Sequence, residues 1–226
     1  MKDIGNRYEI SSLTNDKVKL INSLHHRKYR REHNLFVAEG IRICREAAEN
    51  GWEIRYLLYD NLNADIQIIE GLISDVLCLG ADVIGVTSEI LSKISHKENP
   101  QNVLCVISQK WNDLPTIIKD KTFVALETVR DPGNLGTILR TMDGVGATDC
   151  ILLDECTDPF SYESVRASMG AIFNVNIIAY SSENFLKWKS RHKISLIGTS
   201  LINSNDYTKT NWQLPFVLAM GNEQQG

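Results

Sequence analysis

Apolar and polar positions alternate along the first hundred residues in a pattern that predicts short strands separated by helices. Apolar runs of five to eight residues are typical of strands, and apolar residues at a spacing of three and four are typical of helices. Strands are expected at 35–40, 53–60 and 82–88, and helices at 15–32 (capped by Asn15 or Thr14), 41–51, 64–80 and 89–95. This alternation predicts a small α/β unit with a largely parallel sheet.

The second half of the chain repeats the alternation more regularly. Strands are expected at 123–129, 150–155, 175–181, 194–200 and 214–221, and helices at 135–146, 161–173 and 183–193. Such an order is typical of an open, doubly wound parallel sheet, whose ligands bind at the carboxyl ends of the strands. The polar, Pro-containing segment 96–102 marks a boundary, so we expect one domain over 1–99 and a second over 100–226.

Composition excludes several classes of protein. Of 226 residues, 43% are hydrophobic and 23% are charged, an ordinary globular balance that argues against disorder. Neither an apolar run of about 20 residues nor a secretory signal is present, so we expect a cytoplasmic protein with no membrane contact. Five cysteines without a C-x-x-C pair predict reduced thiols, and no histidine spacing indicates a metal site.

Charge is distributed unevenly. The chain has a net charge of −4, yet residues 17–33 carry six basic residues against one acidic residue. A local cationic strip on an acidic body attracts phosphate, and the histidines and Tyr29 in this segment add donors and a stacking surface. A solvated helix face explains the same pattern, and on this segment alone that interpretation is slightly favoured.

The most informative segment runs from Glu127 to Ala147. A buried strand turns through an Asp-Pro-Gly sequence into a helix that Asn134 is placed to cap. Gly136 and Arg140 share a face one turn apart, so we expect the glycine to leave space for a partner that reaches the guanidinium. The G-x-G-x-x-G fingerprint of dinucleotide-binding proteins and the phosphate loop of nucleotide hydrolases are both absent.

The run DPGNLGTILRTMDGVGA resembles the first signature, N-x-G-x-x-x-R, of the SpoU/TrmH family of RNA ribose 2′-O-methyltransferases in the SPOUT superfamily. Asn134, Gly136 and Arg140 occupy its three fixed positions. VRASMGAIF at 165–173 and FVLAMGNEQQG at 216–226 resemble the central and second signatures of the same family. The basic N-terminal segment is similar to the small α/β RNA-binding domain that many members carry.

The resemblance implies a fold, a cofactor and a reaction. It implies an α/β chain with an N-terminal RNA-binding domain and a methyltransferase domain of the trefoil-knot type, incomplete because the sequence stops at Gly226 before a third signature. The implied cofactor is S-adenosylmethionine, and the implied reaction methylates a ribose 2′-hydroxyl of structured RNA. Ribosomal RNA is preferred over transfer RNA because of the separate N-terminal domain. Family members dimerise through the knotted region, so a homodimer is implied as well.

Site residues follow from the same resemblance. The implied catalytic residues are Asn134, Arg140 and Glu223, the implied cofactor-binding residues are Thr199, Met220 and Gly221, and the implied RNA contacts are Arg27, Lys28, Arg30 and Arg31. Because arginine is a poor general base, we expect Arg140 to bind an RNA phosphate and stabilise oxyanion character on the attacking oxygen. Two other hypotheses stay open: an RNA-binding module without catalysis, and a nucleotide-dependent oxidoreductase.

Overall fold

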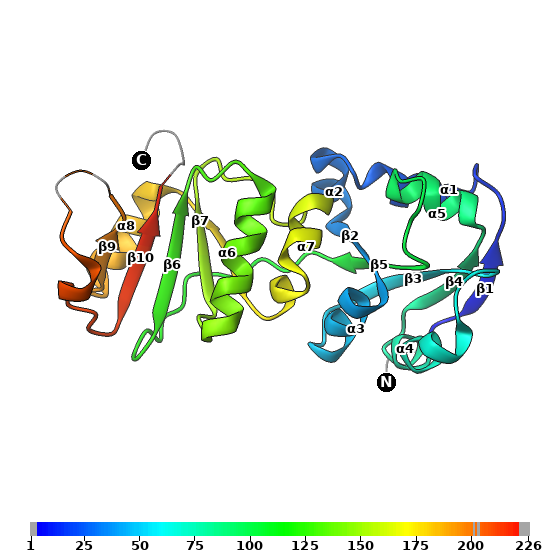
Figure 1. The fold of residues 1–226 in the computed structure, drawn as a ribbon, viewed down its shortest axis with the longest axis horizontal. Helices are drawn as coiled ribbons and strands as arrows, with labels where there is room; N and C mark the ends of the chain where they lie inside the picture. Colours follow the sequence, from blue (N-terminus) through cyan, green and yellow to red (C-terminus); the bar gives the residue numbers. More distant parts are fainter. Residues whose placement is uncertain (1–3, 201, 203, 222–226) are drawn as a thin grey trace.

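Two α/β units lie side by side along the long axis of the molecule (Figure 1). The computed structural model describes residues 4–200, 202 and 204–221. Among these residues, no helix combines the length and the apolar character needed to cross a membrane.

The N-terminal unit contains a five-stranded sheet with the order β1-β4-β3-β5-β2. Its strands are β1 (Arg7–Ile10), β2 (Leu35–Glu39), β3 (Ile54–Asp60), β4 (Asp82–Val86) and β5 (Val103–Ser108). β1, β4 and β3 are parallel, whereas β5 runs antiparallel to both of its neighbours. The sheet is therefore mixed, and the prediction of a largely parallel sheet holds for three of its strands.

The position of β5 corrects the predicted domain boundary between residues 99 and 100. β5 lies inside the N-terminal sheet, hydrogen-bonded to β3 on one side and to β2 on the other. The polar segment that indicated a boundary is a loop leading into this strand, and polar loops of this kind also occur within domains. The sheet connectivity therefore moves the end of the N-terminal unit from 99 to beyond Ser108.

Helices cover both faces of the N-terminal sheet. They are α1 (Asp16–Ser23), α2 (Arg27–His33), α3 (Ile41–Glu49), α4 (Ile66–Cys78) and α5 (Ser88–Ser95). α1 and α5 pack on one face, and α3 and α4 pack on the other (Figure 1). Asn15 caps α1 as expected, because its side chain accepts a hydrogen bond from the Lys17 backbone nitrogen at 2.9 Å.

The single helix predicted over 15–32 is divided into α1 and α2. The division leaves the carbonyl oxygens of Leu24 and His25 outside a helix, and the Nη1 atom of Arg30 donates to both, at 2.8 and 2.7 Å. The buried guanidinium thus satisfies backbone groups that the break would otherwise leave unpaired. Apolar periodicity does not reveal such a break, because Ile21 and Leu24 are both buried on either reading.

The C-terminal unit is an open parallel sheet with the order β8-β7-β6-β10-β9. Its elements are β6 (Thr122–Glu127), α6 (Pro132–Val145), β7 (Asp149–Leu153), α7 (Tyr162–Ser168), the 3-10 helix η1 (Ala171–Phe173), β8 (Asn176–Tyr180), α8 (Ser182–Arg191), β9 (Ser195–Gly198), the 3-10 helix η2 (Tyr207–Lys209) and β10 (Phe216–Met220). α6, α7 and η1 cover one face, and α8 covers the other (Figure 1). The predicted doubly wound parallel sheet is confirmed.

The two units share one hydrophobic core. Phe36 of β2 lies 4.9 Å, centroid to centroid, from Phe160 of the C-terminal unit, and Trp52 lies 5.2 Å from Phe173. The Trp52 indole nitrogen also donates to the Phe173 carbonyl oxygen at 3.0 Å. Because buried aromatic groups and a hydrogen bond cross the boundary, the N-terminal unit is packed firmly against the C-terminal unit.

Candidate active site at the carboxyl edge of the C-terminal sheet

The first signature lies where β6 ends and α6 begins. Asp131, not Asn134, is the N-cap, because its Oδ1 atom accepts a hydrogen bond from the Asn134 backbone nitrogen at 2.7 Å. Pro132 at the first helical position explains the difference, since proline is favoured immediately after a cap. Asn134 is therefore in the first turn of α6, exposed, at the carboxyl edge of the sheet.

Gly136 is buried against α7 and does not leave the space that was predicted beside Arg140. A Cβ atom at this position would lie 2.4 Å from the Ala167 Cβ and 2.8 Å from the Ser168 backbone nitrogen. Ala167 and Ser168 belong to the segment that resembles the central signature. The glycine thus allows α6 and α7 to pack closely, and the first and central signatures meet at this helix contact.

Arg140 lies two turns into α6 and is exposed. Within the described part of the chain, its guanidinium has no hydrogen-bonding or ion-pair partner. A guanidinium that is not neutralised by a neighbouring carboxylate remains available to a phosphate or another anion. This arrangement is compatible with the role expected for Arg140.

A hollow of about 300 Å³ lies at the carboxyl ends of β6, β9 and β10. It brings together the three predicted cofactor-binding residues, Thr199, Met220 and Gly221. The remaining lining residues are Ala125, Glu127, Leu153, Ser182, Phe185, Leu186, Leu196, Gly198 and Ala219. The Thr199 backbone nitrogen donates to the Ala219 carbonyl oxygen at 3.0 Å, which ties the turn after β9 to β10.

The structure does not bring every predicted catalytic residue into this hollow. The lining is on the face of the sheet covered by α8, whereas α6 packs on the opposite face. Asn134 and Arg140 are accordingly not among the described lining residues, although α6 begins at the same edge (Figure 1). Glu223 lies outside the described residues.

The backbone is strained at the ends of two neighbouring strands. Thr128 follows β6 with φ = 52°, and Asp154 follows β7 with φ = 54°. A β-branched residue rarely adopts positive φ, and such a conformation costs about 1–3 kcal/mol. Strain of this kind concentrates at functional sites, and here it lies at the edge that carries both the hollow and the first signature.

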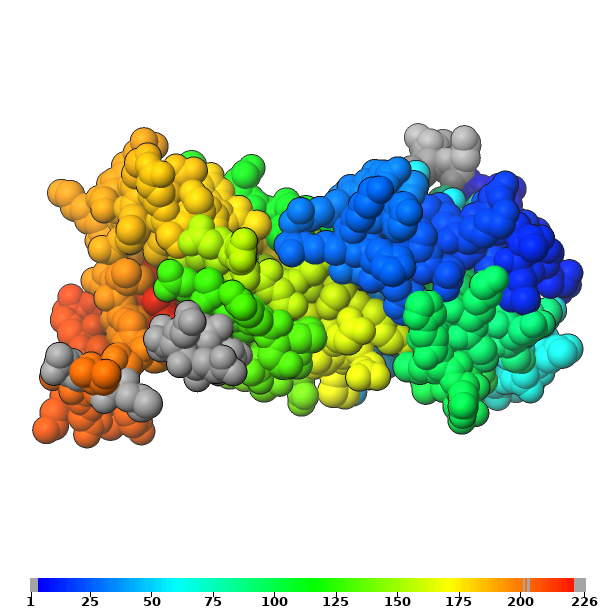
Figure 2. Space-filling model, turned by 90° about the horizontal axis from the view of Figure 1, so that it is seen from above, coloured from blue at the N-terminus to red at the C-terminus, as the bar shows by residue number. Residues whose placement is uncertain are grey.

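The cationic strip is divided by the structure into exposed and buried members. Arg27, Lys28 and Arg31 are exposed on α2, at the same edge as the carboxyl ends of the C-terminal strands (Figures 1 and 2). Arg30 is only 4% exposed. Its Nε and Nη2 atoms donate to Asp158 Oδ2 at 3.0 and 2.7 Å. The prediction that Arg30 contacts RNA is corrected: its charge is already neutralised in a buried ion pair.

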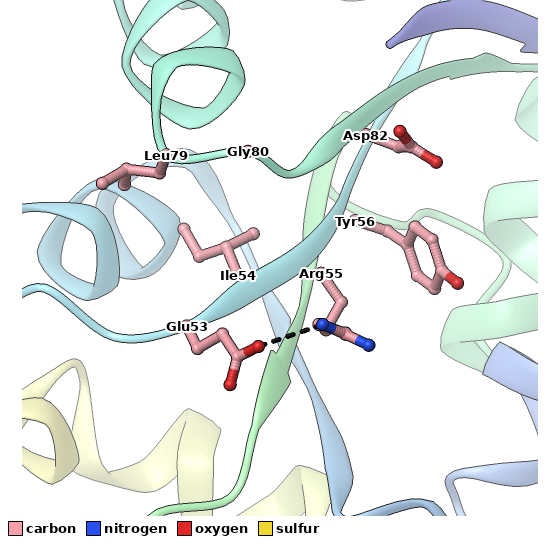
Figure 3. Close-up of a pocket in the computed structure, with 7 residues that line it drawn as sticks. All are labelled: Glu53, Ile54, Arg55, Tyr56, Leu79, Gly80 and Asp82. Atoms are coloured by element: carbon pink, nitrogen blue, oxygen red, sulfur yellow. Dashed lines mark hydrogen bonds and ion pairs between the residues drawn. The ribbon is translucent and has the colours of Figure 1, made fainter. Parts of the chain in front are cut away.

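A different hollow, of about 420 Å³, lies on the N-terminal sheet near the start of β3 and β4 (Figure 3). Its charged side chains are already paired: Arg55 donates to Glu53 at 3.0 Å, and Lys17 binds Asp82 at 3.0 Å. Burial alone would raise the pKa of Asp82, but hydrogen bonds from Lys17 and Asn6 outweigh it, so the pKa lies below its ordinary value. This hollow contains no signature residue and offers no uncompensated charge.

Neither a metal nor a cysteine nucleophile is indicated. No group of three or more potential metal ligands occurs among the described residues. All five cysteines are free, and four of them are buried. Burial raises the pKa of Cys156, which therefore remains a thiol and donates to the Leu126 carbonyl oxygen at 3.2 Å.

The sequence did not point to three residues that line a hollow or join the two units: Glu127, Trp111 and Asp158. Glu127 had a detectable signal, because it is a charged residue that directly ends an apolar strand. Trp111 and Asp158 lie in loops without a regular apolar pattern, so the sequence gives no sign of them. Their hydrogen bonds, to Gln109 and to Arg30, form only in the folded chain.

Comparison with known proteins gives the same division of the chain. The SpoU rRNA Methylase family matches residues 121–226, and the MRM3-like substrate binding domain matches residues 15–105. The 23S rRNA (guanosine(2553)-2′-O)-methyltransferase RlmP of Bacillus subtilis is 27% identical over 96% of this chain and 84% of its own.

Solved structures of similar proteins cover nearly the whole chain. An rRNA methyltransferase from Sinorhizobium meliloti is 39% identical, with a TM-score of 0.90 over 98% of this chain and 84% of its own. Its AdoMet-bound form is 38% identical, with a TM-score of 0.89 and the same coverage of both chains. The SpoU methyltransferase AviRb from Streptomyces viridochromogenes, in complex with AdoMet, is 26% identical over 94% of this chain and 83% of its own, with a TM-score of 0.85. The resemblance seen in the signatures is thereby confirmed, and the chain belongs to the SpoU family of RNA methyltransferases.

Proposed function

We propose that this protein transfers a methyl group from S-adenosylmethionine to a ribose 2′-hydroxyl of ribosomal RNA. One observation carries the proposal. The predicted cofactor residues Thr199, Met220 and Gly221 line one hollow at the edge where α6 also begins. The fold around this hollow overlays with a TM-score of 0.89 on a structure described as AdoMet-bound.

The lining residues fit S-adenosylmethionine. Leu153, Phe185 and Leu196 provide apolar surface against which a purine ring packs. Gly221 has no side chain, which allows the backbone to approach a ligand closely. The negatively charged Glu127 side chain attracts the positively charged sulfonium, so the hollow is electrostatically suited to this cofactor.

Residues of this chain have the task of orienting the RNA and stabilising the charge that develops on it. The bound cofactor supplies an electrophilic methyl group. The Arg140 guanidinium holds an RNA phosphate near the reacting ribose. As the 2′ oxygen releases its proton to water and bonds to the methyl carbon, whose bond to the sulfonium sulfur breaks, the guanidinium stabilises the negative charge on that oxygen. Asn134, one turn earlier on α6, orients the ribose, and Glu223 supports the guanidinium or the adjoining loop.

The N-terminal unit holds the RNA substrate. Arg27, Lys28 and Arg31 are exposed at the edge that carries the cofactor hollow, so they neutralise phosphates of a strand that reaches the site. The match to a substrate binding domain over residues 15–105 supports this role. Relatives named as 23S rRNA methyltransferases favour ribosomal over transfer RNA as the substrate.

The experiment has two parts. Methyl incorporation from labelled S-adenosylmethionine is measured with ribosomal RNA and with transfer RNA, and cofactor binding is measured by calorimetry. Incorporation into ribosomal RNA supports the proposal, and preferential incorporation into transfer RNA would change the substrate. If the protein binds RNA but calorimetry detects no heat of binding for S-adenosylmethionine, the proposed enzyme activity is wrong and the protein is an RNA-binding module.

We further propose that the protein is a homodimer in the cytoplasm. Leu196, Trp212 and Leu214 are each at least 40% exposed around the edge strand β9, which leaves apolar surface for a second copy. Five free thiols fit a reducing compartment. A mass of one chain measured by light scattering would contradict the dimer.

A further inference from the structure

A second hollow lies between the two units, at the same edge as the cofactor hollow. Its volume is about 430 Å³. It is lined by residues of α2, of the segment that joins the two units and of the segment after β7, chiefly Arg27, Arg31, Trp111, Asn112, Asp154 and Thr157. In Figure 2, which looks onto this edge, α2 (blue) lies beside the yellow-green surface of the C-terminal unit.

The helix that carries two arginines of this hollow is held in a fixed position. Arg27 and Arg31 are four residues apart on α2, so they lie on one face of the helix. Arg30, between them, forms the buried ion pair with Asp158 of the C-terminal unit. The pair fastens α2 to that unit and keeps both exposed guanidinium groups over the hollow without neutralising either of them.

Trp111 is exposed yet rigidly held. Trp111 is 43% exposed, and its Nε1 atom donates to Gln109 Oε1 at 3.1 Å. The ring stands edge-on to Phe160, with a centroid distance of 5.0 Å and an interplanar angle of 86°. Gln109 in turn donates to the carbonyl oxygens of Arg30 and Leu35. An aromatic platform is therefore preorganised beside two cations.

The two hollows are adjacent. Leu153 lines the cofactor hollow and the next residue, Asp154, lines the second one. The Asp154 carboxylate accepts hydrogen bonds from the backbone nitrogen, at 3.2 Å, and the hydroxyl of Ser182, and Ser182 lines the cofactor hollow. An RNA strand bound in the second hollow therefore reaches the carboxyl end of β7, the strand whose last residue lines the cofactor hollow.

We propose that this hollow binds an unpaired nucleotide of the RNA substrate, with its base stacked on the Trp111 indole and the flanking phosphates bound by Arg27 and Arg31. The inference rests on the proposed function and names how the substrate is held. Bases in a duplex are stacked on one another and do not reach an aromatic side chain, whereas unpaired bases do. The Asp154 carboxylate accepts hydrogen bonds from Ser182, and the Asn112 side chain donates to Asn176, so neither side chain is assigned to the base or to the phosphates.

The test uses the full chain and an unstructured RNA of about 10 nucleotides that carries one 2-aminopurine, with a blunt RNA duplex for comparison. Trp111→Ala removes the platform, and Trp111→Phe retains an aromatic ring. Leu62→Ala is the control for the loss of a large exposed apolar side chain, because Leu62 is 82% exposed and follows β3 in the N-terminal unit. For charge, the double variant Arg27→Ala/Arg31→Ala is compared with Arg42→Ala/Arg45→Ala on α3, which carries the same change in net charge.

Trp111→Ala is expected to weaken binding of the unstructured RNA about 5- to 100-fold, and Trp111→Phe to restore most of it. The Arg27/Arg31 double variant should lower the slope of log affinity against log salt by about 0.7 for each arginine, and both controls should leave affinity and slope unchanged. Equal affinity of wild type and Trp111→Ala, or equal binding of duplex and unstructured RNA, would overturn the subsite.

The outcome separates this subsite from the proposed function. Quenching of 2-aminopurine that disappears in Trp111→Ala supports the subsite even if no methyl transfer is detected, in which case only the proposed activity fails. If the wild type transfers methyl groups and Trp111→Ala shows the same transfer and the same RNA affinity, that result would contradict the subsite and leave the proposed function intact. Thermal unfolding of each variant shows whether a loss of binding comes from a loss of fold.

Discussion

The guanidinium of Arg30 and the carboxylate of Asp158 lie 2.7 Å apart, Nη2 to Oδ2, although 128 residues separate them in the sequence. Arg30 also donates to two backbone carbonyl oxygens at the break between α1 and α2. The guanidinium thus makes four hydrogen bonds from its five N–H groups. The contact joins α2 of the N-terminal unit to the C-terminal unit.

Breaking this pair from one side is expected to be costly. Asp158→Ala leaves a buried arginine without its counter-charge, so we expect a loss of about 3–5 kcal/mol in the free energy of unfolding. Chemical denaturation measures the loss. The matched control is Glu53→Ala, which breaks the exposed pair with Arg55 and should cost at most about 1 kcal/mol. Equal losses in the two variants would show that the Arg30–Asp158 pair contributes no more than a surface ion pair.

Gly136 and Gly144 provide a matched test on one helix. Gly136→Ala forces a methyl group to within 2.4 Å of the Ala167 Cβ, and overpacking of this kind costs about 1–3 kcal/mol. Gly144→Ala meets open space, so the higher helix propensity of alanine should raise the free energy of unfolding by about 0.5–1 kcal/mol. Thermal and chemical unfolding measure both variants. Changes of the same sign would contradict the close contact between α6 and α7.

Arg140 is expected to affect catalysis and not cofactor affinity. Arg140→Ala should lower methyl transfer about 100- to 1,000-fold, as removal of an oxyanion-stabilising donor does. Its affinity for S-adenosylmethionine should stay within a factor of two or so of wild type, because Arg140 is not among the described lining residues of the cofactor hollow. Thr141→Ala on the same helix is the control. A large loss of cofactor affinity in Arg140→Ala would instead place this arginine in the cofactor site.

His25 makes stability depend on pH. Burial lowers its pKa below the ordinary value of 6.5, while its Nε2 atom lies 2.6 Å from the Ile94 carbonyl oxygen and its ring stacks on His96. The unfolded chain therefore binds a proton at a higher pH than the folded chain does. Stability is fully present above about pH 7 and declines as the pH falls through the unfolded pKa.

Thermal unfolding between pH 7.5 and pH 5.5 measures this decline. His25→Gln retains a donor for the Ile94 carbonyl and should flatten the pH dependence, whereas His33→Gln, at an exposed position of α2, should leave it unchanged. Tyr162, Glu163 and Arg30 also face His25 from the neighbouring elements. An undiminished pH dependence in His25→Gln would assign the effect to another group.

Much of the fold was predictable because buried strands in this chain are short apolar runs. The five strands of the C-terminal sheet lie within two residues of their predicted positions, since each is bounded by polar turns. The domain boundary expected after residue 99 wrongly placed residues 103–108, which form β5, in the second domain. A local apolar run indicates a strand but contains no information about which sheet it joins, and β5 pairs with β2 and β3, which precede it by more than 40 residues.

The site was predictable where a motif determined it and not where long-range packing did. The three residues that the resemblance implied for the cofactor, Thr199, Met220 and Gly221, line one hollow, and their role in cofactor binding stays a prediction. Arg30 and its neighbours Arg27 and Arg31 are chemically identical in the sequence, and only the distant Asp158 makes one of them structural. Gly136 was assigned to ligand access because the helix α7 that fills this space comes 26 residues later.

Each sheet receives its last described strand in an interior position: β5 enters between β3 and β2, and β10 enters between β6 and β9. During synthesis on the ribosome, the two strands that flank β5, and later the two that flank β10, emerge first. Their hydrogen-bonding edges stay unpaired until the strand that lies between them has been synthesised. Unpaired edges of this kind favour contacts with other nascent chains. Chaperone dependence should therefore be greatest just before residues 103–108 and again before residues 216–220 leave the exit tunnel, and ribosome-bound chains stalled at these two lengths would reveal it.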